Sequence, residues 1–249
     1  MWECKSQTLV ELAAGMGMLA LGHLFGSVLE PNHRLFRLED PAIQFPMAAH
    51  EHVPNWLLVL LVFVLPAAVL AGLSVLSQRL NKTIQTTAVA FLFAVGLNML
   101  ATGLLKFMIG NPRPDFLSRC IPRADTQPGA YLTASVCTTA NRSVLQEGFR
   151  SSPSGHSSNA FCGLGFLALW LHGEARAFGQ LTLGHEIAGF LSVYMLAVFI
   201  AVSRITDYRH HWYDVLVGSA IGFCVSYGTY YMFFLRKPAV YTPVPEIPV

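Results

Sequence analysis

About six long apolar runs constrain the fold of this chain more than any other feature of its sequence. They lie near residues 8–29, 54–76, 86–107, 157–173, 187–204 and 214–235. A helix that crosses the hydrocarbon core of a bilayer needs about 20 mostly apolar residues, and each run is close to that length or above it. The sequence therefore predicts an all-α, polytopic membrane protein, a bundle of about six transmembrane helices.

The composition agrees with a membrane protein and disfavours a large soluble protein with buried helices. Only 12% of the residues are charged and the mean hydropathy is +0.49, whereas about a quarter of a soluble domain is charged. The net charge of +2 is too small to indicate a nucleic-acid partner. We expect one domain over residues 1–237, anchored by its first run without a cleaved signal, and a disordered Pro-rich tail over 238–249.

The fourth run gives the weakest signal of a membrane span. Ser157, Ser158 and Asn159 open it, and Gly163 and Gly165 lie inside it. Small residues such as these favour close helix packing over contact with lipid. We therefore expect this helix to pack against its neighbours.

The loops after the first, third and fifth spans should lie on one side of the membrane. The third loop, residues 108–156, is the longest, and long loops in a compact fold are usually functional. It carries an acceptor sequon for glycosylation at Asn141, which favours a lumenal or external position. The number of Lys and Arg residues points the other way, but long loops translocate largely regardless of charge. We expect cytoplasmic termini.

Two cysteines of the third loop, Cys120 and Cys137, leave two possibilities open. They could form a disulfide if the loop faces an oxidising compartment. Two cysteines in one loop can also remain unpaired. The sequence does not decide between these states.

Polar residues gather between the fifth and sixth runs, in Ser203–Asp214, S-R-I-T-D-Y-R-H-H-W-Y-D. Charge at a membrane boundary is expensive where it faces lipid, so such a cluster indicates a functional site. His210 and Asp214 are four residues apart, and on a helix they would share a face. A carboxylate there can hold an imidazole in one tautomer and make it a better nucleophile or base. Alone, the cluster could also be an interfacial turn with snorkelling charges.

A second cluster, Lys106–Pro114, ends the third run with K-F-M-I-G-N-P-R-P. Lys106 is a point charge at the membrane edge, and Arg113 stands between two prolines that limit its backbone freedom. A lysine and an arginine together can clamp an anion. Alone, this pair could be a snorkelling lysine beside an arginine that sets topology.

A third cluster, S-S-P-S-G-H-S, precedes the fourth run. Ser154 and Gly155 resemble a loop whose backbone N–H groups open onto a helix N-terminus, which is a ready anion site. His156 is placed to give or take a proton there. Alone, this segment could be a capped helix start with an interfacial histidine.

Taken together, the three clusters carry the pattern K-x6-R-P, P-S-G-H and S-R-x5-H-x3-D, complete and in order. The chain here resembles the type 2 phosphatidic acid phosphatase superfamily, the lipid phosphate phosphatases. The segments N-P-R-P-D-F-L-S-R-C, D-Y-R-H-H-W-Y-D-V and F-R-L-E-D-P-A-I-Q-F-P look most similar to fungal diacylglycerol pyrophosphate phosphatases and their plant relatives. The positions of Cys120 and Cys137 also look like that group.

The resemblance implies a mechanism that needs no metal and no cofactor. His210 would attack phosphorus, Asp214 would orient it, and His156 would protonate the departing oxygen and then activate water. The phosphoryl oxygens would be held by Lys106, Arg113, Ser154, Gly155 and Arg204. His211 is the rival nucleophile, because it is three residues from Asp214, but the family spacing after Arg204 selects His210.

The resemblance also implies a membrane lipid phosphate phosphatase that hydrolyses phosphatidate, diacylglycerol pyrophosphate, lysophosphatidate or similar lipids. A polyprenyl diphosphate phosphatase or a lipid headgroup transferase of the same superfamily is the main alternative. A scaffold that has lost catalysis and a transporter are further ones, but the complete motifs disfavour both. The expected location is an endomembrane (vacuole, endoplasmic reticulum or Golgi) or the plasma membrane, with the active site on the lumenal or external face. The preferred lipid and the oligomeric state stay open.

Overall fold

The computed structural model describes residues 2–76, 82–178 and 183–236. The tail at 238–249, for which the sequence predicts disorder, lies outside these residues. Within the described segments there is no β-strand, and only two isolated bridges occur, Phe36–Leu132 and Pro122–Cys137. The predicted all-α fold class is confirmed.

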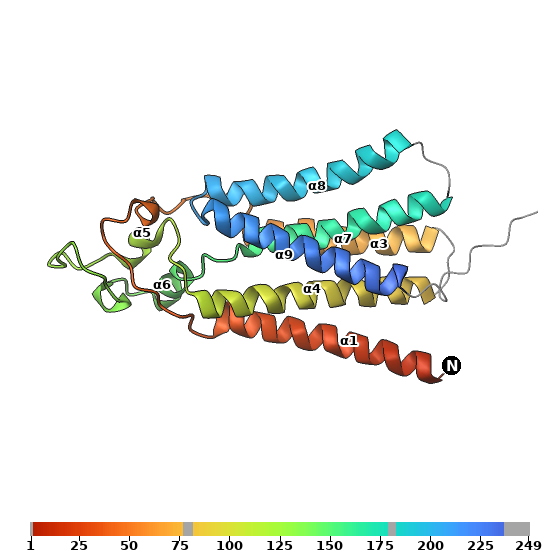
Figure 1. Ribbon diagram of the computed structural model, residues 1–249, viewed down its shortest axis with the longest axis horizontal. Coiled ribbons are helices and arrows are strands. Elements are labelled where there is room, and N and C mark those ends of the chain that lie inside the picture. The colour runs from red at the N-terminus through yellow and green to blue at the C-terminus, as the bar shows by residue number, and fades with distance from the viewer. Residues whose placement is uncertain (1, 77–81, 179–182, 237–249) are drawn as a thin grey trace, which may run out of the picture.

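Long helices run side by side along the long axis of the molecule and form a bundle (Figure 1). In chain order they are α1 (Trp2–His23) with the π-helical turn η1 (Leu24–Val28), α2 (Asn55–Val59) with η3 (Leu60–Val64) and α3 (Leu65–Leu76), α4 (Lys82–Ile109), α7 (Gly155–Phe178), α8 (Leu183–Thr206), and α9 (Trp212–Tyr230) with η5 (Tyr231–Leu235). Among the described residues, five stretches are long and apolar enough to cross a membrane: Gln7–Val28, Asn55–Val75, Ile84–Ile109, Ile187–Thr206 and Trp212–Leu235. They match the first, second, third, fifth and sixth predicted spans, as expected of a multi-pass membrane protein.

Helix α7 replaces the weak fourth span of the sequence prediction. It extends beyond 157–173 at both ends and packs against α4, α8 and α9. It is not among the five apolar stretches, and most of its residues from His156 to Trp170 are buried inside the protein. Because other helices rather than lipid surround α7, its sequence needs small packing residues more than high hydropathy.

Glycines allow the helices of the bundle to approach closely. A Cβ atom on Gly103 of α4 would lie 2.3 Å from the carbonyl oxygen of Gly22 on α1, so any larger residue would push these helices apart. A Cβ atom on Gly218 of α9 would lie 2.5 Å from the carbonyl oxygen of Ser154. The second contact fixes the start of α7 against α9, where two of the three motifs meet.

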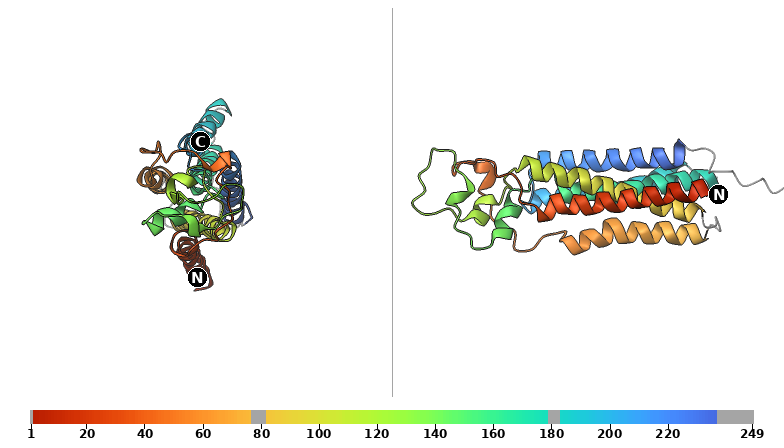
Figure 2. Two further views of the ribbon diagram at one scale, coloured as in Figure 1. Left: turned by 90° about the vertical axis from the view of Figure 1, so that its left-hand side faces the viewer. Right: turned by 90° about the horizontal axis from the view of Figure 1, so that it is seen from below.

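The loops after α1, α4 and α8 lie at one end of the bundle, and the N-terminus lies at the other (Figures 1 and 2). The first two loops build a small cap with the short helices η2 (Pro41–Ile43), α5 (Phe116–Cys120), η4 (Ala134–Val136) and α6 (Arg142–Gly148). Phe36, Phe116 and Phe149 form much of its apolar core. The cap therefore holds the ends of the loops that carry the motifs in fixed positions.

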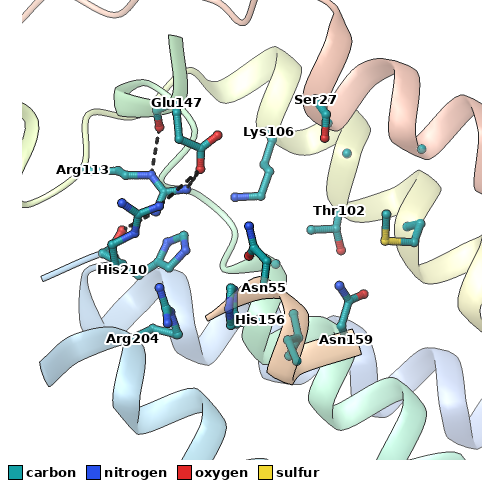
Figure 3. Close-up of a pocket in the computed structure, with 17 residues that line it drawn as sticks. Ser27, Asn55, Thr102, Lys106, Arg113, Glu147, His156, Asn159, Arg204 and His210 are labelled. Atoms are coloured by element: carbon teal, nitrogen blue, oxygen red, sulfur yellow. Dashed lines mark hydrogen bonds and ion pairs between the residues drawn. The ribbon is translucent and has the colours of Figure 1, made fainter. Parts of the chain in front are cut away.

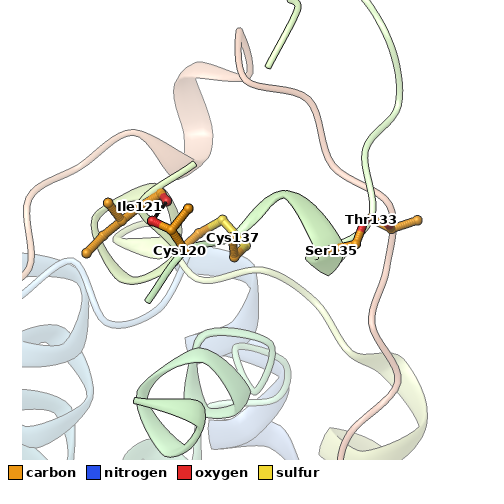
Figure 4. The surroundings of a disulfide bond; sticks show 6 residues. Cys120, Ile121, Thr133, Ser135 and Cys137 are labelled. Atoms are coloured by element: carbon orange, nitrogen blue, oxygen red, sulfur yellow. Dashed lines mark hydrogen bonds between the residues drawn. A yellow bond between two sulfur atoms is a disulfide. The ribbon is translucent and has the colours of Figure 1, made fainter. Parts of the chain in front are cut away.

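A disulfide joins Cys120 at the end of α5 to Cys137 just after η4 (Figure 4). Beside it, Arg119 and Asp115 form a buried ion pair, with Nη2 of the arginine 2.6 Å from Oδ2 of the aspartate. Asn141, the predicted glycosylation site, is exposed at the start of α6, and its side chain accepts a hydrogen bond from the backbone N–H of Val144. The disulfide thus links two distant parts of the third loop within the cap.

Candidate active site

A cavity of about 310 Å³ lies where α1, α2, α4 and α7 meet the loop that precedes α9 (Figure 3). All three motifs contribute to its lining. The ionisable residues that line it are Lys106, Arg113, Glu147, His156, Arg204, Arg209 and His210. Gly155 lines it as well, whereas two other predicted site residues, Ser154 and Asp214, lie behind the wall.

Lys106 brings a positive charge to the cavity from the last turn of α4. Its side chain is buried, and Nζ donates a hydrogen bond to the carbonyl oxygen of Arg150 at 2.7 Å. An ammonium group has three donors. Two of them remain available to an anion in the cavity, because the carbonyl oxygen of Arg150 is the only partner of Lys106 Nζ among the described residues.

Arg113 is buried beside Lys106, and the cap holds its guanidinium. Nε donates to the carbonyl oxygen of Glu147 at 2.9 Å, and Nη1 donates to that of Arg209 at 3.0 Å. Nη2 is ion-paired with the Glu147 carboxylate. The arginine is therefore oriented from several sides before any substrate binds.

Arg204 lies in the last turn of α8 and is almost fully buried. Nη1 donates to the carbonyl oxygen of Val53 at 2.9 Å, and Nη2 donates to Oε2 of Glu51 at 2.8 Å. Asp207, one turn later, lies 3.4 Å from Nη1. The first loop, far away in the sequence, and the residue just after α8 thus position this cation.

His210 lies in the turn between α8 and α9 and is 3% exposed. Its Nδ1 is 2.6 Å from the carbonyl oxygen of Ser151. Because a carbonyl oxygen can only accept, Nδ1 carries the proton and Nε2 keeps its lone pair. Burial, followed by the positive charges of Arg113 and Lys106, lowers the pKa of His210 well below its ordinary value. A neutral imidazole with a free Nε2 is the form that a nucleophile requires.

His211, the rival nucleophile, lies outside the cavity lining. It is the N-cap of α9, its Nε2 is 3.1 Å from the carbonyl oxygen of Pro112, and its ring stacks on Tyr213. The structure therefore places only His210 of this pair among the cations.

The expected helical pairing of His210 with Asp214 is wrong in its geometry. Helix α9 begins at Trp212, so His210 precedes the helix and does not share a face with Asp214. Asp214 Oδ2 accepts hydrogen bonds from Ser151 Oγ at 2.5 Å and from the backbone N–H of His211 at 3.0 Å. The carboxylate is linked to His210 through Ser151, whose hydroxyl donates to Asp214 and whose carbonyl oxygen accepts from His210.

The P-S-G-H segment divides between the cavity and the structure behind it. Ser154 is fully buried, and its Oγ accepts a hydrogen bond from Ser157 Oγ at 2.9 Å. Gly155 and His156 face the cavity. His156 Nε2 is 3.0 Å from the carbonyl oxygen of Val53. Gly155 can therefore offer its N–H at the start of α7, whereas Ser154 is engaged in positioning that turn.

Sequence reasoning missed several residues that build the site. Glu51 and the Val53 carbonyl come from the first loop, and Asn55 from the start of α2. Glu51 is a charged residue just before the second apolar run, and this position could have drawn attention to it. A backbone carbonyl has no signature in the sequence, so the contributions of Val53 and Ser151 could not be found there.

Glu147 belongs to none of the three motifs, yet its carboxylate lines the cavity among the cations. Burial alone would raise the pKa of its carboxyl, but the charges of Arg113, Lys106 and Arg209 outweigh burial and lower the pKa below its ordinary value. Burial and then the positive charge of Arg113 lower the pKa of Arg209 to about 10. Both groups are therefore ionised at neutral pH.

In the part of the chain that the structure describes, no group of three or more His, Cys, Asp or Glu side chains is arranged to hold a metal ion. The cavity lining instead carries the cations of Lys106, Arg113, Arg204 and Arg209. Fixed cations around a transferring phosphoryl group are the usual means of stabilising its transition state.

Comparison with known proteins extends the similarity over most of the chain. It is 36% identical to the probable diacylglycerol pyrophosphate phosphatase 1 of Schizosaccharomyces pombe over 94% of this chain and 82% of that protein. It is 37% identical to diacylglycerol pyrophosphate phosphatase 1 of Saccharomyces cerevisiae over 88% and 76%, and 35% identical to lipid phosphate phosphatase 2 of Arabidopsis thaliana over 87% and 73%. No solved structure matches the chain. The sequence model of the PAP2 superfamily matches residues 87–238, which contain all three motifs, and the chain therefore belongs to the PAP2 superfamily.

Proposed function

We propose that this protein is a membrane lipid phosphatase that transfers the phosphoryl group of its substrate to His210 and then to water. The observation that carries the proposal is a neutral, buried His210 facing a cavity lined by Lys106, Arg113 and Arg204 at the end of the membrane-spanning helices. This arrangement supplies a nucleophile and the countercharge for a phosphoryl group.

In the first step, Nε2 of His210 attacks phosphorus and the bond between phosphorus and the lipid oxygen breaks. In its doubly protonated form His156 donates the Nδ1 proton to that oxygen, so the lipid leaves as an alcohol, or as a lipid phosphate when the substrate is a diphosphate, and His156 is left neutral. In the second step His156 takes a proton from water, which attacks phosphohistidine and releases inorganic phosphate. The three cations and the N–H of Gly155 hold the phosphoryl oxygens through both steps.

The substrate class follows from the family and from the position of the cavity. Its named relatives are diacylglycerol pyrophosphate phosphatases and a lipid phosphate phosphatase. Catalytic residues at the ends of membrane spans can reach a headgroup while the acyl chains stay in the bilayer. We propose phosphatidate, diacylglycerol pyrophosphate, lysophosphatidate or similar lipids as substrates.

For the topology we propose cytoplasmic termini and an active site on the lumenal or external face of an endomembrane or the plasma membrane. The disulfide of the cap supports this orientation, because disulfides persist in oxidising compartments. Exposed Asn141 on the same cap supplies the test. Glycosylation of Asn141 in the native membrane supports a lumenal or external cap. Labelling of the cap by a reagent confined to the cytosol contradicts it.

A substrate panel in the presence of EDTA tests the proposed reaction. The panel consists of phosphatidate, diacylglycerol pyrophosphate, lysophosphatidate, sphingosine phosphate and a polyprenyl diphosphate, each in mixed micelles with the purified protein. We expect phosphate release from glycerolipid phosphates without added metal, and inhibition by vanadate. A strict requirement for magnesium, or activity confined to the polyprenyl diphosphate, contradicts the proposal.

A further inference from the structure

The active-site cavity has two chemically different ends. Arg113, Glu147 and His210 lie at one end, and Thr102 and Asn159 lie at the other, with Lys106 and His156 between them (Figure 3). On α4, apolar Met99 lies one turn beyond Thr102 as seen from Lys106, and the lining also includes Leu58 and the glycines Gly22, Gly26 and Gly103. Thr102, Asn159 and these lining residues carry no charge.

Asn159 presents an amide to the uncharged end from one turn below His156 on α7. Its side chain is 9% exposed, and Oδ1 accepts a hydrogen bond from Nδ2 of Asn98 at 2.7 Å. This bond orients the amide, so the two N–H groups of Asn159 point away from Asn98. No acceptor in the described parts of the chain binds them.

Three neighbouring side chains hold this amide in a continuous polar network between α4 and α7. Thr102 Oγ1 donates to Ser158 Oγ at 3.0 Å, and Asn98 Nδ2 lies 3.5 Å from the same oxygen. Asn98 and Thr102 lie within the third membrane span, where buried polar groups are costly and usually functional. The network does more than join α4 to α7, because the free N–H groups of Asn159 face the cavity.

We propose that the Asn159 amide forms a leaving-group subsite that binds an ester carbonyl oxygen of an uncharged glycerolipid backbone. This inference rests on the proposed phosphatase function. In a phosphomonoester substrate the glycerol oxygen leaves beside His156, so the backbone must lie past His156. Along the cavity the charge then falls from cationic to neutral polar to apolar, in the order of a phosphate, an ester backbone and an acyl chain.

The test compares ester-linked phosphatidate with its diether analogue, which has the same chain lengths but no carbonyl oxygens. Wild-type protein, Asn159→Leu and the double variant Asn98→Leu/Asn159→Leu are assayed for kcat/KM in mixed micelles. Asn159→Leu alone leaves the buried Asn98 amide without its partner and could therefore fold poorly. The double variant removes both amides and avoids this problem. Thr87→Val is the matched control. Thr87 is a buried polar residue on α4, the helix of Asn98, and it does not line the cavity.

We expect the wild type to prefer the diester about tenfold, the size of one hydrogen bond. Both Asn159 variants should lose this preference through a fall in kcat/KM for the diester, with the diether changed less than twofold. An equal loss for both lipids shows a purely structural role and overturns the subsite, as does an unchanged preference. If the wild type releases no phosphate from either lipid, the proposed function itself fails, which is a different result.

Discussion

The two histidines of the cavity are held in opposite ways by backbone carbonyl groups. His210, in the turn before α9, binds the carbonyl oxygen of Ser151 through Nδ1 at 2.6 Å. His156, in the first turn of α7, binds that of Val53 through Nε2 at 3.0 Å. Each ring therefore offers the other nitrogen. In the proposed mechanism, the nitrogen that each ring leaves free, rather than the residue type, distinguishes the nucleophile His210 from the acid–base group His156.

Their surroundings separate the two histidines further. Burial lowers the pKa of both rings well below the ordinary value, and it is reinforced by the charges of Arg113 and Lys106 at His210 and by that of Arg204 at His156. His156 lies between that group and the uncharged end of the cavity (Figure 3). A nucleophile benefits from cations that also hold the phosphoryl oxygens, whereas the proton donor must stand beside the leaving oxygen.

The largest effect should come from removing the nucleophile. We expect His210→Ala to lower phosphate release about 10⁴-fold or more, because no phosphohistidine can form. His211→Ala should retain much of the activity, since that ring lies outside the cavity. Phosphate release and acid-labile labelling of the purified variants measure both. The reverse ranking would assign the nucleophile to His211.

His156→Ala should separate the roles of the two histidines. With a lipid substrate we expect a loss of about 10²–10⁴-fold, the usual contribution of general acid–base catalysis. Nitrophenyl phosphate has a leaving group that needs no proton, so His210 can still be phosphorylated. Rapid mixing should therefore show a burst of about one nitrophenol per active site, followed by slow turnover, as for a trapped covalent intermediate. Absence of a burst, with activity lost equally on both substrates, would break the distinction.

The next effect concerns how Asp214 supports His210. Because its carboxylate reaches the nucleophile through Ser151, we expect Asp214→Asn to lower kcat about 100-fold and Ser151→Ala to lower it about fivefold. The double variant should be no slower than Asp214→Asn alone. A double-mutant cycle of kcat measures this coupling. Strictly additive losses would mean that Asp214 acts on His210 without Ser151.

The sequence predicts the bundle well because its signal is local. Twenty apolar residues specify a membrane span wherever they occur, and five predicted spans lie where expected. The ends of α7 were placed less well, because burial by other helices removes the apolar signal on which the prediction depends. The 157–173 run is therefore part of a longer helix, Gly155–Phe178.

The site could be predicted only as far as its side chains follow a spacing. Lys106, Arg113, Arg204 and His210 were found in this way, and the fold brings them to one cavity. The i, i+4 spacing of His210 and Asp214 suggested a shared helix face that does not exist. Periodicity does not show that α9 begins between the two residues. Carbonyl partners depend on the approach of distant backbone segments, about which a linear pattern contains no information.

The smallest effect should come from Glu147, an anion already present where a phosphoryl group must bind. Its carboxylate is paired with Arg113 and lies 3.8 Å from Nη2 of Arg209. Glu147→Gln removes this competing charge but keeps the backbone carbonyl that holds Nε of Arg113. We expect inorganic phosphate to inhibit the variant about 3–10-fold more strongly than the wild type.

The pH dependence of phosphate inhibition makes this last prediction specific to the carboxylate. The cations lower the pKa of Glu147, so its charge is present at neutral pH and is lost only as the pH falls through that lowered pKa. The wild type should therefore approach the Glu147→Gln variant in acid and differ from it fully at neutral pH. Asp125→Asn, on an exposed ion pair of the same loop, is the matched control and should leave inhibition unchanged. Weaker inhibition of Glu147→Gln would show instead that the carboxylate mainly positions Arg113. Glu147 would then help the cations around His210 to bind phosphate rather than compete with phosphate for them.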